Sequence, residues 1–378
     1  AEQGQTKEVG ALGEQVKLKV TIRADHADLT LTSDQWVSNL ARTQEFISGR
    51  RVRGVFAAMF YGTRHATAPK SPDAARRLFF SDETRFGDCC IVQDALPVLP
   101  MPLSTFYCKH HPPGSEREHG ALVDALRGEP PEACAECGAP MERASGWRRR
   151  SGYWFGASCR ERTSTALKDG TADEGRLFTR EGIAQETVLS GEIVTTLELW
   201  DEFVAGTGMR LGEDIDIVLG SSCPAIMRVE MMEDSPQAVG VQPPQGNGAG
   251  GEVTVTFLSD VLIDDELGEP VTVLDDKGLL GALGLNGIQG VSVAARFQAT
   301  TRVSGWNAAW GLPMGQRPGI AAGSCFLLSI LTDDLEGPMR LLQAAEKKGI
   351  GVRCNEGFGR IRVNDPFHNT AQGVSTDG

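Results

Sequence analysis

The sequence predicts an α+β protein with two domains, from its length and a repeated order of strands and helices. Its 378 residues exceed the usual size of one domain. Residues 14–24 (EQVKLKVTIRA) alternate apolar and polar side chains, which predicts a half-buried strand. An amphipathic helix follows, and the same order recurs in the second half of the chain. The repeat favours two ferredoxin-like (split βαβ) halves.

The composition is that of a globular protein, with 40% hydrophobic and 23% charged residues. No run of about 18 apolar residues exists, which excludes a membrane span, and we expect no membrane partner. Residues 1–14 are polar and lack the apolar core of a signal peptide. We therefore expect a flexible N-terminus on a cytoplasmic protein.

The net charge of −13 and the pI near 5.0 argue against a free-standing nucleic-acid binder. The arginines are nevertheless clustered, and each cluster is compatible with a solvated face or a binding site. The clusters are Arg50, Arg51 and Arg53; Arg148, Arg149 and Arg150; Arg160 and Arg162; and Arg353, Arg360 and Arg362.

The first predicted helix begins in a segment rich in glycine and arginine, FISGRRVRGVFAAMFYG (residues 46–62). Ser48 and Gly49 are a plausible cap and turn. The apolar side chains then follow helical spacing: Val52, Val55, Phe56, Met59 and Phe60. Free amides and the helix dipole favour an anion at such an N-terminus, and the alternative is a plain turn with solvated arginines.

Two short-spaced ligand pairs lie in the irregular segment that follows. CKHH contains Cys108 and His111, and CAECG contains Cys134 and Cys137. These pairs are typical of a tetrahedral zinc knuckle, in an insertion at about residues 81–150. His110 is an alternative to His111. With four protein ligands the Zn²⁺ would be structural, and we interpret the other cysteines, including Cys89 and Cys90, as core residues.

The second half is expected to begin at residue 186, giving domains at 15–185 and 186–378. GEIVTTLELW (residues 191–200) is the expected opening strand, and EVTVTFLSDVLI (252–263) is a later one. LEGPMRLLQAAEKKG (335–349) predicts a helix that Gly349 closes. A segment rich in glycine and arginine follows it.

Common catalytic motifs are missing. The sequence contains no P-loop, HExxH or GxSxG motif, and its GNGAGG leads into a strand rather than a helix. Among the histidines outside the ligand pairs, we expect His26, His65, His119 and His368 at the surface. A ribonuclease that uses His26 or His65 as a general base stays open as an alternative.

Several segments, in this order, resemble the RAMP superfamily of CRISPR effector proteins. FISGRRVRGVFA is similar to the segment that opens the first helix in that superfamily, RERTSTALKDGTADEGRLFTREGIA to its central thumb-like hairpin, and NEGFGRIRVNDPF to its C-terminal glycine-rich loop. LPMPLSTFYCK, the CxxC knuckle and SGWNAAWGLPMGQRPGIAAGSCF are similar to the RAMP protein of type III-D CRISPR–Cas systems.

The resemblance implies two ferredoxin-like (RRM-like) halves and a non-catalytic subunit of the five-group type. Such a subunit would hold the repeat-derived 5′ tag of the guide RNA. It would also bridge the large polymerase-like subunit and the backbone subunits, and meet target RNA only indirectly. The implied RNA contacts are Gly49, Arg50, Arg51, Arg53, Gly54, Arg160, Arg162, Thr163, Gly357, Phe358, Gly359 and Arg360.

The sequence departs from the family pattern in two places. ISG replaces the usual IPG, and GMRLGEDIDIVLG is acidic where basic residues are expected. Two other functions therefore stay open. One is a backbone-type RAMP subunit that cuts target RNA with Asp25, Asp28 or Asp169, or that processes guide RNA. The other is a zinc-stabilised scaffold that contacts only protein.

Overall fold

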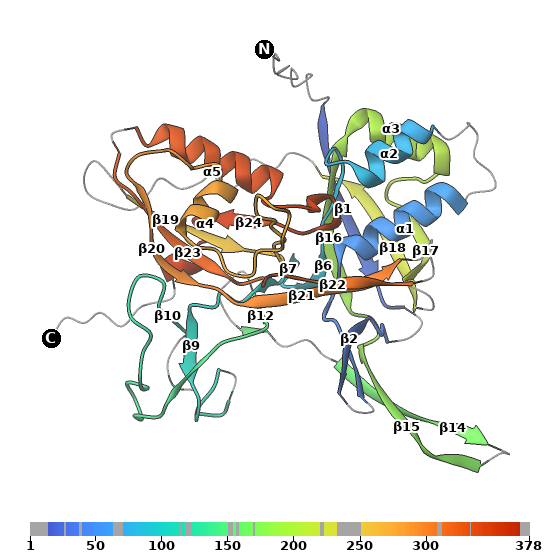
Figure 1. The fold of residues 1–378 in the computed structure, drawn as a ribbon. Helices are drawn as coiled ribbons and strands as arrows, with labels where there is room; N and C mark the ends of the chain where they lie inside the picture. Colours follow the sequence, from blue (N-terminus) through green and yellow to red (C-terminus); the bar gives the residue numbers. More distant parts are fainter. Residues whose placement is uncertain are drawn as a thin grey trace.

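The computed structural model describes residues 14–25, 28–37, 40–62, 71–113, 115–117, 119, 122–149, 154–155, 159–168, 171–219, 223–232, 251–307, 312–332 and 334–370. The sequence predictions for residues 1–13, His26, His65 and Asp169 lie outside these ranges. Two sheets with helices on one face stand side by side, joined by an insertion and a long hairpin (Figure 1).

The first domain has a βαββαβ order. Its elements are β1 (Gln15–Arg23), α1 (Gly49–Gly62), β6 (Cys89–Gln93), β16 (Val188–Thr196), α3 (Leu197–Thr207) and β18 (Cys223–Met231). The sheet order is β17-β18-β1-β16-β6-β4, where β17 is Asp214–Leu219 and β4 is Phe46–Ile47. This is the ferredoxin-like arrangement. The predicted alternation of β1 is confirmed, because Leu18, Val20 and Ile22 are fully buried.

The helices cover one face of this sheet. The predicted face of α1 is confirmed by the burial of Val52, Val55, Phe56 and Phe60. α2 (Pro72–Phe80) packs against α3 and, through the rings of Phe79 and Phe60, against α1. It begins at Ser71, whose side chain accepts the Ala74 N–H. Thr196 caps α3 in the same way through the Leu199 N–H.

The predicted domain boundary at residues 185 and 186 is wrong. β16 pairs with β1 over nine residues, from Gln15 opposite Thr196 to Arg23 opposite Val188. α3, β17 and β18 then complete the same domain, so the first domain extends to Met231. Alternation of apolar residues predicts a strand, but it does not show which strand is its partner.

The second domain begins at Gly251 and repeats the same order. Its elements are β19 (Gly251–Phe257), α4 (Asp276–Ala282), β20 (Val291–Phe297), β23 (Cys325–Ile330), α5 (Glu336–Lys348) and β24 (Ile361–Val363). The sheet order β20-β23-β19-β24 matches the first domain. Gly349 ends α5 with φ of +82°, as predicted, and its N–H bonds to the Ala345 carbonyl.

The cysteine-containing insertion starts later than predicted. β5 (Arg85–Phe86) and β6 belong to the first sheet, and the insertion follows β7 (Leu96–Pro97). It contains β8 (Leu99–Pro100), β9 (Thr105–Cys108), β10 (Val123–Asp124), β11 (Met141–Arg143), β12 (Trp147–Arg148) and β13 (Trp154–Phe155). It packs against the second domain, where Leu126 shares a core with Cys325 and Leu327.

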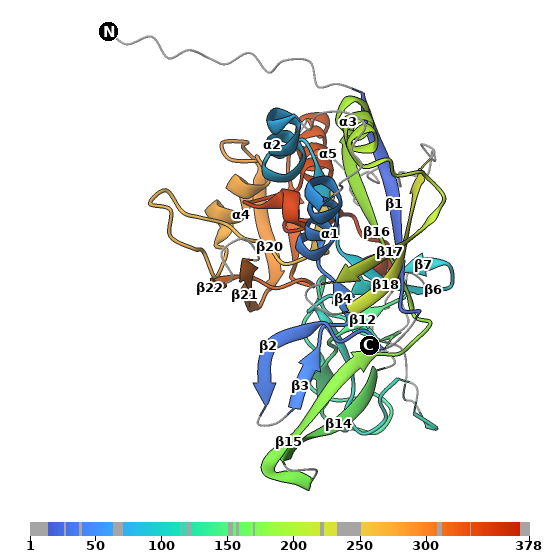
Figure 2. The same ribbon diagram turned by 90° about the vertical axis from the view of Figure 1, so that its right-hand side faces the viewer.

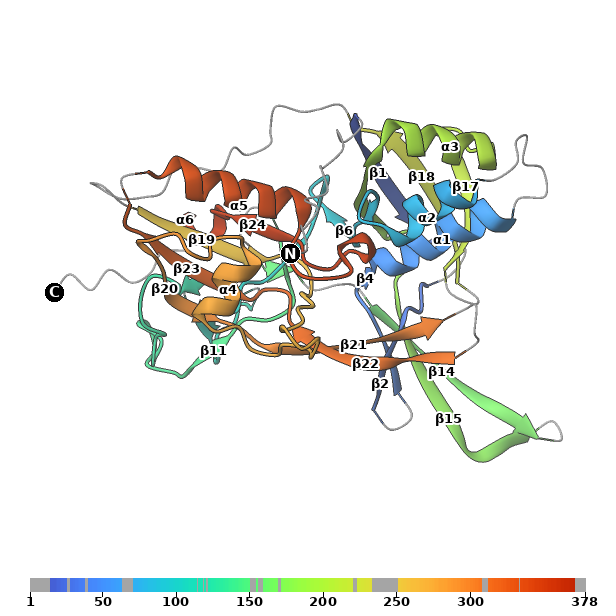
Figure 3. The same ribbon diagram turned by 45° about the horizontal axis from the view of Figure 1, so that its top comes forward.

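Two hairpins extend from the domains. β14 (Cys159–Lys168) and β15 (Thr171–Ile183) form a sheet with β3 (Leu40–Thr43) and β2 (Thr32–Val37), which projects from the first domain (Figure 2). β21 (Thr300–Asn307) and β22 (Leu312–Ile320) lead from the second domain towards the first (Figure 3). The described part of the chain contains no helix with the length and apolarity of a membrane span.

Candidate nucleic-acid interface and metal centre

The two segments rich in glycine and arginine meet between the domains. The loop after α5 contains η1 (Cys354–Glu356) and reaches the start of α1 (Figure 3). A Cβ on Gly49 would overlap the Phe86 carbonyl and lie 2.7 Å from the Glu356 oxygen. A Cβ on Gly357 would lie 3.3 Å from the Gly49 Cα. Glycine at both positions lets two backbones touch across the domain junction.

The amides of these segments donate within the chain. Gly49 donates to Asp88 Oδ1 at 2.7 Å, Gly357 to the Cys354 carbonyl at 3.2 Å, Gly359 to the Asp260 carbonyl at 2.9 Å, and Arg360 to Ser259 Oγ at 2.9 Å. A phosphate at this junction would therefore be bound by side chains rather than by these four amides.

Asp88 caps the N-terminus of α1, the role expected of Ser48. No sequence motif singled out Asp88. Ser48 Oγ is buried and accepts no hydrogen bond from the described amides of α1. The Asp88 carboxylate instead accepts the N–H of Gly49, the first residue of the helix. Burial raises the pKa of Asp88 to about 7, although the Gly49 N–H and the charges of Arg360 and Arg50 act against the rise. In the sequence, Asp88 is a lone aspartate between a glycine and two cysteines, and no motif marks it as a helix cap.

The predicted arginines hold the junction together. Arg53 bonds to the Phe79 carbonyl at 3.0 Å and pairs with Glu356 at 3.1 Å. Burial lowers the pKa of Arg53, and the Glu356 charge opposes that effect. Arg353 also pairs with Glu356, and its guanidinium lies 5.3 Å from the Phe358 ring centre.

Arg50 links the first domain to the second. Its guanidinium donates to the Ser304 carbonyl on β21 at 2.5 Å. Arg51 bonds to Gln44 Oε1 at 3.0 Å, and the side chains of Arg51 and Arg360 are half-buried. Gly54 lies exposed on α1 with open space around it. The structure thus brings the predicted contacts within residues 49–54 and 357–360 to one place.

The remaining predicted contacts lie on the projecting hairpin. Arg160 and Arg162 are 61% and 68% exposed and pair with Asp28 at 3.8 Å and 3.0 Å. Thr163 Oγ1 bonds to Thr179 Oγ1 at 3.0 Å. Asp28, one of the aspartates considered for RNA cleavage, is 4% exposed and also accepts the Gln185 N–H.

Three cysteines and one histidine form a cluster that could hold a metal ion. Sγ of Cys108, Cys134 and Cys137 and a ring nitrogen of His119 all lie within 4.8 Å of one another. Cys108 and Cys137 Sγ are 3.6 Å apart, close to the edge of about 3.8 Å expected for a tetrahedron with Zn–S bonds of about 2.3 Å. Backbone N–H groups of Cys137 and Glu136 lower the pKa of Cys134 to about 7.

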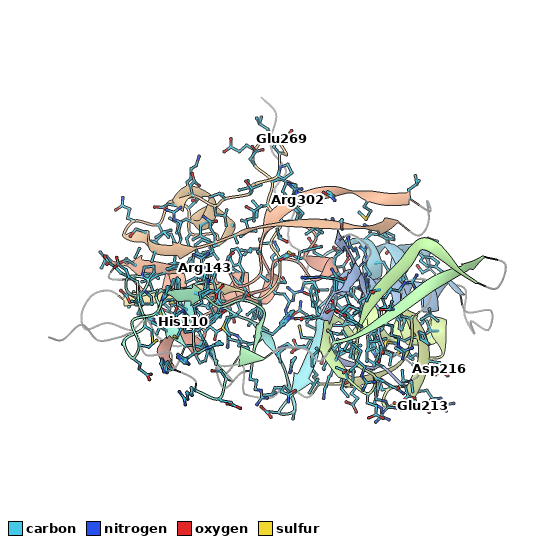
Figure 4. All side chains as sticks on the ribbon, turned by 90° about the horizontal axis from the view of Figure 1, so that it is seen from below. His110, Arg143, Glu213, Asp216, Glu269 and Arg302 are labelled. Atoms are coloured by element: carbon cyan, nitrogen blue, oxygen red, sulfur yellow. The ribbon has the colours of Figure 1, made fainter. Side chains whose placement is uncertain are left out.

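The histidine of this cluster is His119, and neither His111 nor His110, the predicted fourth ligands, belongs to it. His119 supplies the nitrogen, and the ring of His111 packs against it at a tilt, with ring centres 3.9 Å apart. His110 is exposed on the insertion (Figure 4). The short spacing from Cys108 favoured His111, but the loop between the two cysteine pairs returns a later histidine to the cluster.

His368, also expected at the surface, is buried. Its Nδ1 lies 2.7 Å from Asp124 Oδ2, and its Nε2 lies 2.8 Å from Thr256 Oγ1. This Asp–His–hydroxyl arrangement is like that of a hydrolase, but the three side chains are almost fully buried and closed to a substrate. It fastens the insertion to α6 (Phe367–Thr370) and β19.

Arg148, the first residue of the second arginine cluster, lies in the interior and not on a basic surface. Arg148 and Asp365 are both 1% exposed and form an ion pair, with the Arg148 guanidinium 4.8 Å from the Phe367 ring centre. Burial alone would raise the pKa of Asp365, but the charges of Arg148 and Arg362 outweigh it and lower that pKa. Arg148 therefore ties the insertion to the C-terminal segment.

No family model and no curated protein matches the sequence. Among solved structures, the chain is similar to a chain of the Type III-B Cmr-beta complex bound to cognate target RNA, at 13% identity and a TM-score of 0.41, covering 82% of this chain and 86% of that one. It is similar to Cas6 of Thermus thermophilus at 11% identity and a TM-score of 0.38, covering 92% and 98%. It is also similar to a chain of the Csm3–Csm4 subcomplex of a type III-A CRISPR-Cas interference complex, at 9% identity and a TM-score of 0.37, covering 82% and 92%.

Proposed function

We propose that the chain is a non-catalytic subunit of a type III-D CRISPR interference complex, which binds the 5′ tag of the guide RNA at the domain junction. The observation that carries the proposal is the meeting of the segments 49–54 and 353–360, which lie near opposite ends of the sequence. Arginines and Phe358 are concentrated there, and both residue types suit a single-stranded RNA.

The acidic remainder of the chain fits a subunit rather than a free-standing RNA binder. Glu213 and Asp216 are exposed at the far end of the molecule from the insertion (Figure 4). Basic surfaces of the large and backbone subunits would complement such an end. The Cys₃His cluster fits structural Zn²⁺, because its four protein ligands leave no position for a catalytic water.

Crosslinking tests where the guide lies. The complex is purified from cells, irradiated with ultraviolet light and analysed by mass spectrometry. Crosslinks from Phe358 and residues 50–53 to the first nucleotides of the guide support the proposal. Crosslinks repeated along the guide, from several copies per complex, would instead identify a backbone subunit. Absence of RNA crosslinks from this chain would leave the protein-only scaffold.

Arginine variants measure the same interaction in solution. The full chain carries Arg51→Ala and Arg360→Ala together, and Arg210→Ala is the control, since Arg210 is 78% exposed and pairs with Glu213. We expect weaker binding of a single-stranded tag RNA and a salt slope smaller by about 0.7 for each phosphate that the variant no longer binds. Equal affinity and slope in both variants would contradict the proposal.

Cleavage assays separate this proposal from the nuclease alternative. We expect the purified complex to leave guide RNA uncut and any target cleavage to be unchanged by Asp25→Ala in this chain. Loss of cleavage with intact assembly would instead assign the chain a catalytic aspartate.

A further inference from the structure

One carboxylate at the domain junction is held between two arginines. Glu356 in η1 pairs with Arg53 of α1, with Oε1 and Nη2 3.1 Å apart, and it also pairs with Arg353 in the same loop (Figure 3). The side chain of Glu356 is 9% exposed, whereas those of Arg53 and Arg353 are 21% and 23% exposed. Two guanidiniums therefore converge on one nearly buried anion, and part of each guanidine side chain reaches the solvent.

Each of these guanidiniums lies against an aromatic ring. The guanidinium carbon of Arg53 is 6.0 Å from the centre of the Phe80 ring, and that of Arg353 is 5.3 Å from the centre of the Phe358 ring. Phe80, the last residue of α2, is 71% exposed, and Phe358 is half-buried. The contacts run in the order ring, cation, anion, cation, ring. We call these five side chains the junction array.

Hydrogen bonds at the end of α2 hold the array in place. The Phe79 carbonyl accepts Arg53 Nη1 at 3.0 Å and Asn355 Nδ2 at 3.3 Å. Asn355 belongs to η1, as Glu356 does, so α1, α2 and the C-terminal loop are joined at one carbonyl. Arg53 and the loop are thus positioned before a ligand arrives, which lowers the entropic cost of binding.

The backbone of Arg353 is in a conformation that favours glycine. Its φ is +61°, in the left-handed region, where the Cβ of an L-residue is crowded. The neighbouring Gly351 and Gly357 adopt positive φ without this strain. An arginine at such a position indicates that its side chain has a role that glycine could not fill. The pair with Glu356 uses part of the guanidinium, and the exposed remainder is open to a ligand.

We propose that the junction array binds one dinucleotide step of single-stranded RNA, in which the phosphodiester replaces the Glu356 carboxylate between the two guanidiniums. The bases on either side of that phosphate then stack on Phe80 and Phe358. Carboxylates and phosphates accept the same paired hydrogen bonds from arginine, so Glu356 stands in for the phosphate in the free chain. The inference rests on the proposed function, and it adds Phe80, Arg353 and competition by Glu356 to it.

Competition by Glu356 would make the array selective for nucleotides. A free phosphate or an acidic peptide gains only the two guanidiniums, and it must displace a carboxylate that already binds them. A dinucleotide gains the same ion pairs and also covers two aromatic rings. The rings therefore favour RNA over other anions.

Neutralising Glu356 tests the competition. The full chain carries Glu356→Gln, and Glu336→Gln at the opposite end of α5 is the matched control, because Glu336 is 76% exposed and pairs with Arg340. We expect Glu356→Gln to bind a fluorescent single-stranded RNA about fivefold more tightly, since a negative charge beside the phosphate is removed and its repulsion is only partly screened. Equal or weaker binding, with the control at wild-type affinity, would overturn the inference.

Phe80→Leu tests the base contact without changing an ion pair. The ring is exposed, so the free energy of unfolding in urea should stay close to that of the wild type. We expect about tenfold weaker binding of the RNA, because one stacked base is lost, and unchanged binding of an abasic RNA of the same length. An equal loss for both RNAs, or no loss for either, would overturn the inference.

Arg353→Gly removes one cation and keeps the backbone conformation. We expect weaker RNA binding and a salt slope smaller by about 0.7, the value for one phosphate on a single strand. Wild-type affinity in this variant and in Phe80→Leu, with weaker binding in the Arg51→Ala and Arg360→Ala variant, would overturn the array and leave the proposed function intact. Wild-type affinity in all three would contradict both. Polyglutamate that competes as strongly as unlabelled RNA would overturn the assignment to RNA.

Discussion

The charge state of Asp88 should control how the stability of the junction varies with pH. The carboxyl is buried where the two segments meet, and burial raises its pKa to about 7 from 3.8. The folded chain therefore favours the protonated form. The stabilisation is complete below about pH 4 and is lost as the pH rises through 7.

The expected size follows from this shift. Between the two pKa values each pH unit corresponds to about 1.4 kcal/mol, so the interval from pH 5 to pH 7 corresponds to about 2.5 kcal/mol. Asp88→Asn keeps an oxygen for the Gly49 N–H and cannot ionise. The free energy of unfolding of the wild type should fall relative to that of the variant by this amount.

Urea unfolding of both proteins at pH 5, 6, 7 and 8 measures the difference. Glu346, another carboxyl with a raised pKa, is common to both proteins and cancels. Parallel curves across this range would refute the reasoning, because they would show that Asp88 ionises at its ordinary pKa in the folded chain.

The same variant tests whether the junction binds RNA. An ionised Asp88 lies near Arg360 and Arg50 and would repel a phosphate held by them, by roughly 1 kcal/mol at partly screened distances. RNA should therefore bind the wild type about fivefold more tightly at pH 6 than at pH 8, whereas Asp88→Asn should show a flat profile. Identical pH profiles of the wild type and the variant would show that the charge of Asp88 does not affect RNA binding.

Three further changes test the metal cluster, the insertion and the C-terminal loop. His119→Ala should lose the bound metal during gel filtration while His111→Ala retains it, as measured by elemental analysis of the protein peak. Arg148→Ala should lower the free energy of unfolding by about 3–5 kcal/mol, because it leaves the buried Asp365 carboxylate without its ion-pair partner. A smaller loss would show that water reaches the carboxylate. Gly359→Ala should destabilise by more than about 1 kcal/mol, since φ is +77° and the new Cβ would overlap a carbonyl, whereas Gly54→Ala within α1 should stabilise by about 0.5–1 kcal/mol.

The local elements were predictable because apolar periodicity records burial directly. The strand at Gln15–Arg23 and the helices at Gly49–Gly62 and Glu336–Lys348 follow from it. Pairing is a different property, and the strand at Val188–Thr196 is equally compatible with the start of a new domain and with a partner of β1. The register that decides between them depends on residues far away in sequence.

The metal cluster also shows that local features can be predicted from the sequence and long-range contacts cannot. Cys108, Cys134 and Cys137 follow from spacing, since short pairs bring two sulfur atoms to one ion. His119 depends instead on the path of the loop between the pairs, and the ring of His111 packs against it. Sequence spacing therefore identifies ligands that lie within one turn of the chain. Which residue further along the chain joins them depends on the tertiary structure.

The glycines of the two Gly/Arg segments show why sequence alone cannot separate packing from binding. A bound ligand can approach a backbone closely only where no Cβ is present, and the same holds for a second segment of backbone. At Gly49 and Gly357 the neighbour is the chain itself, and the amides are used there. The arginines remain as the candidates for RNA, so side-chain charge rather than backbone shape must distinguish this surface.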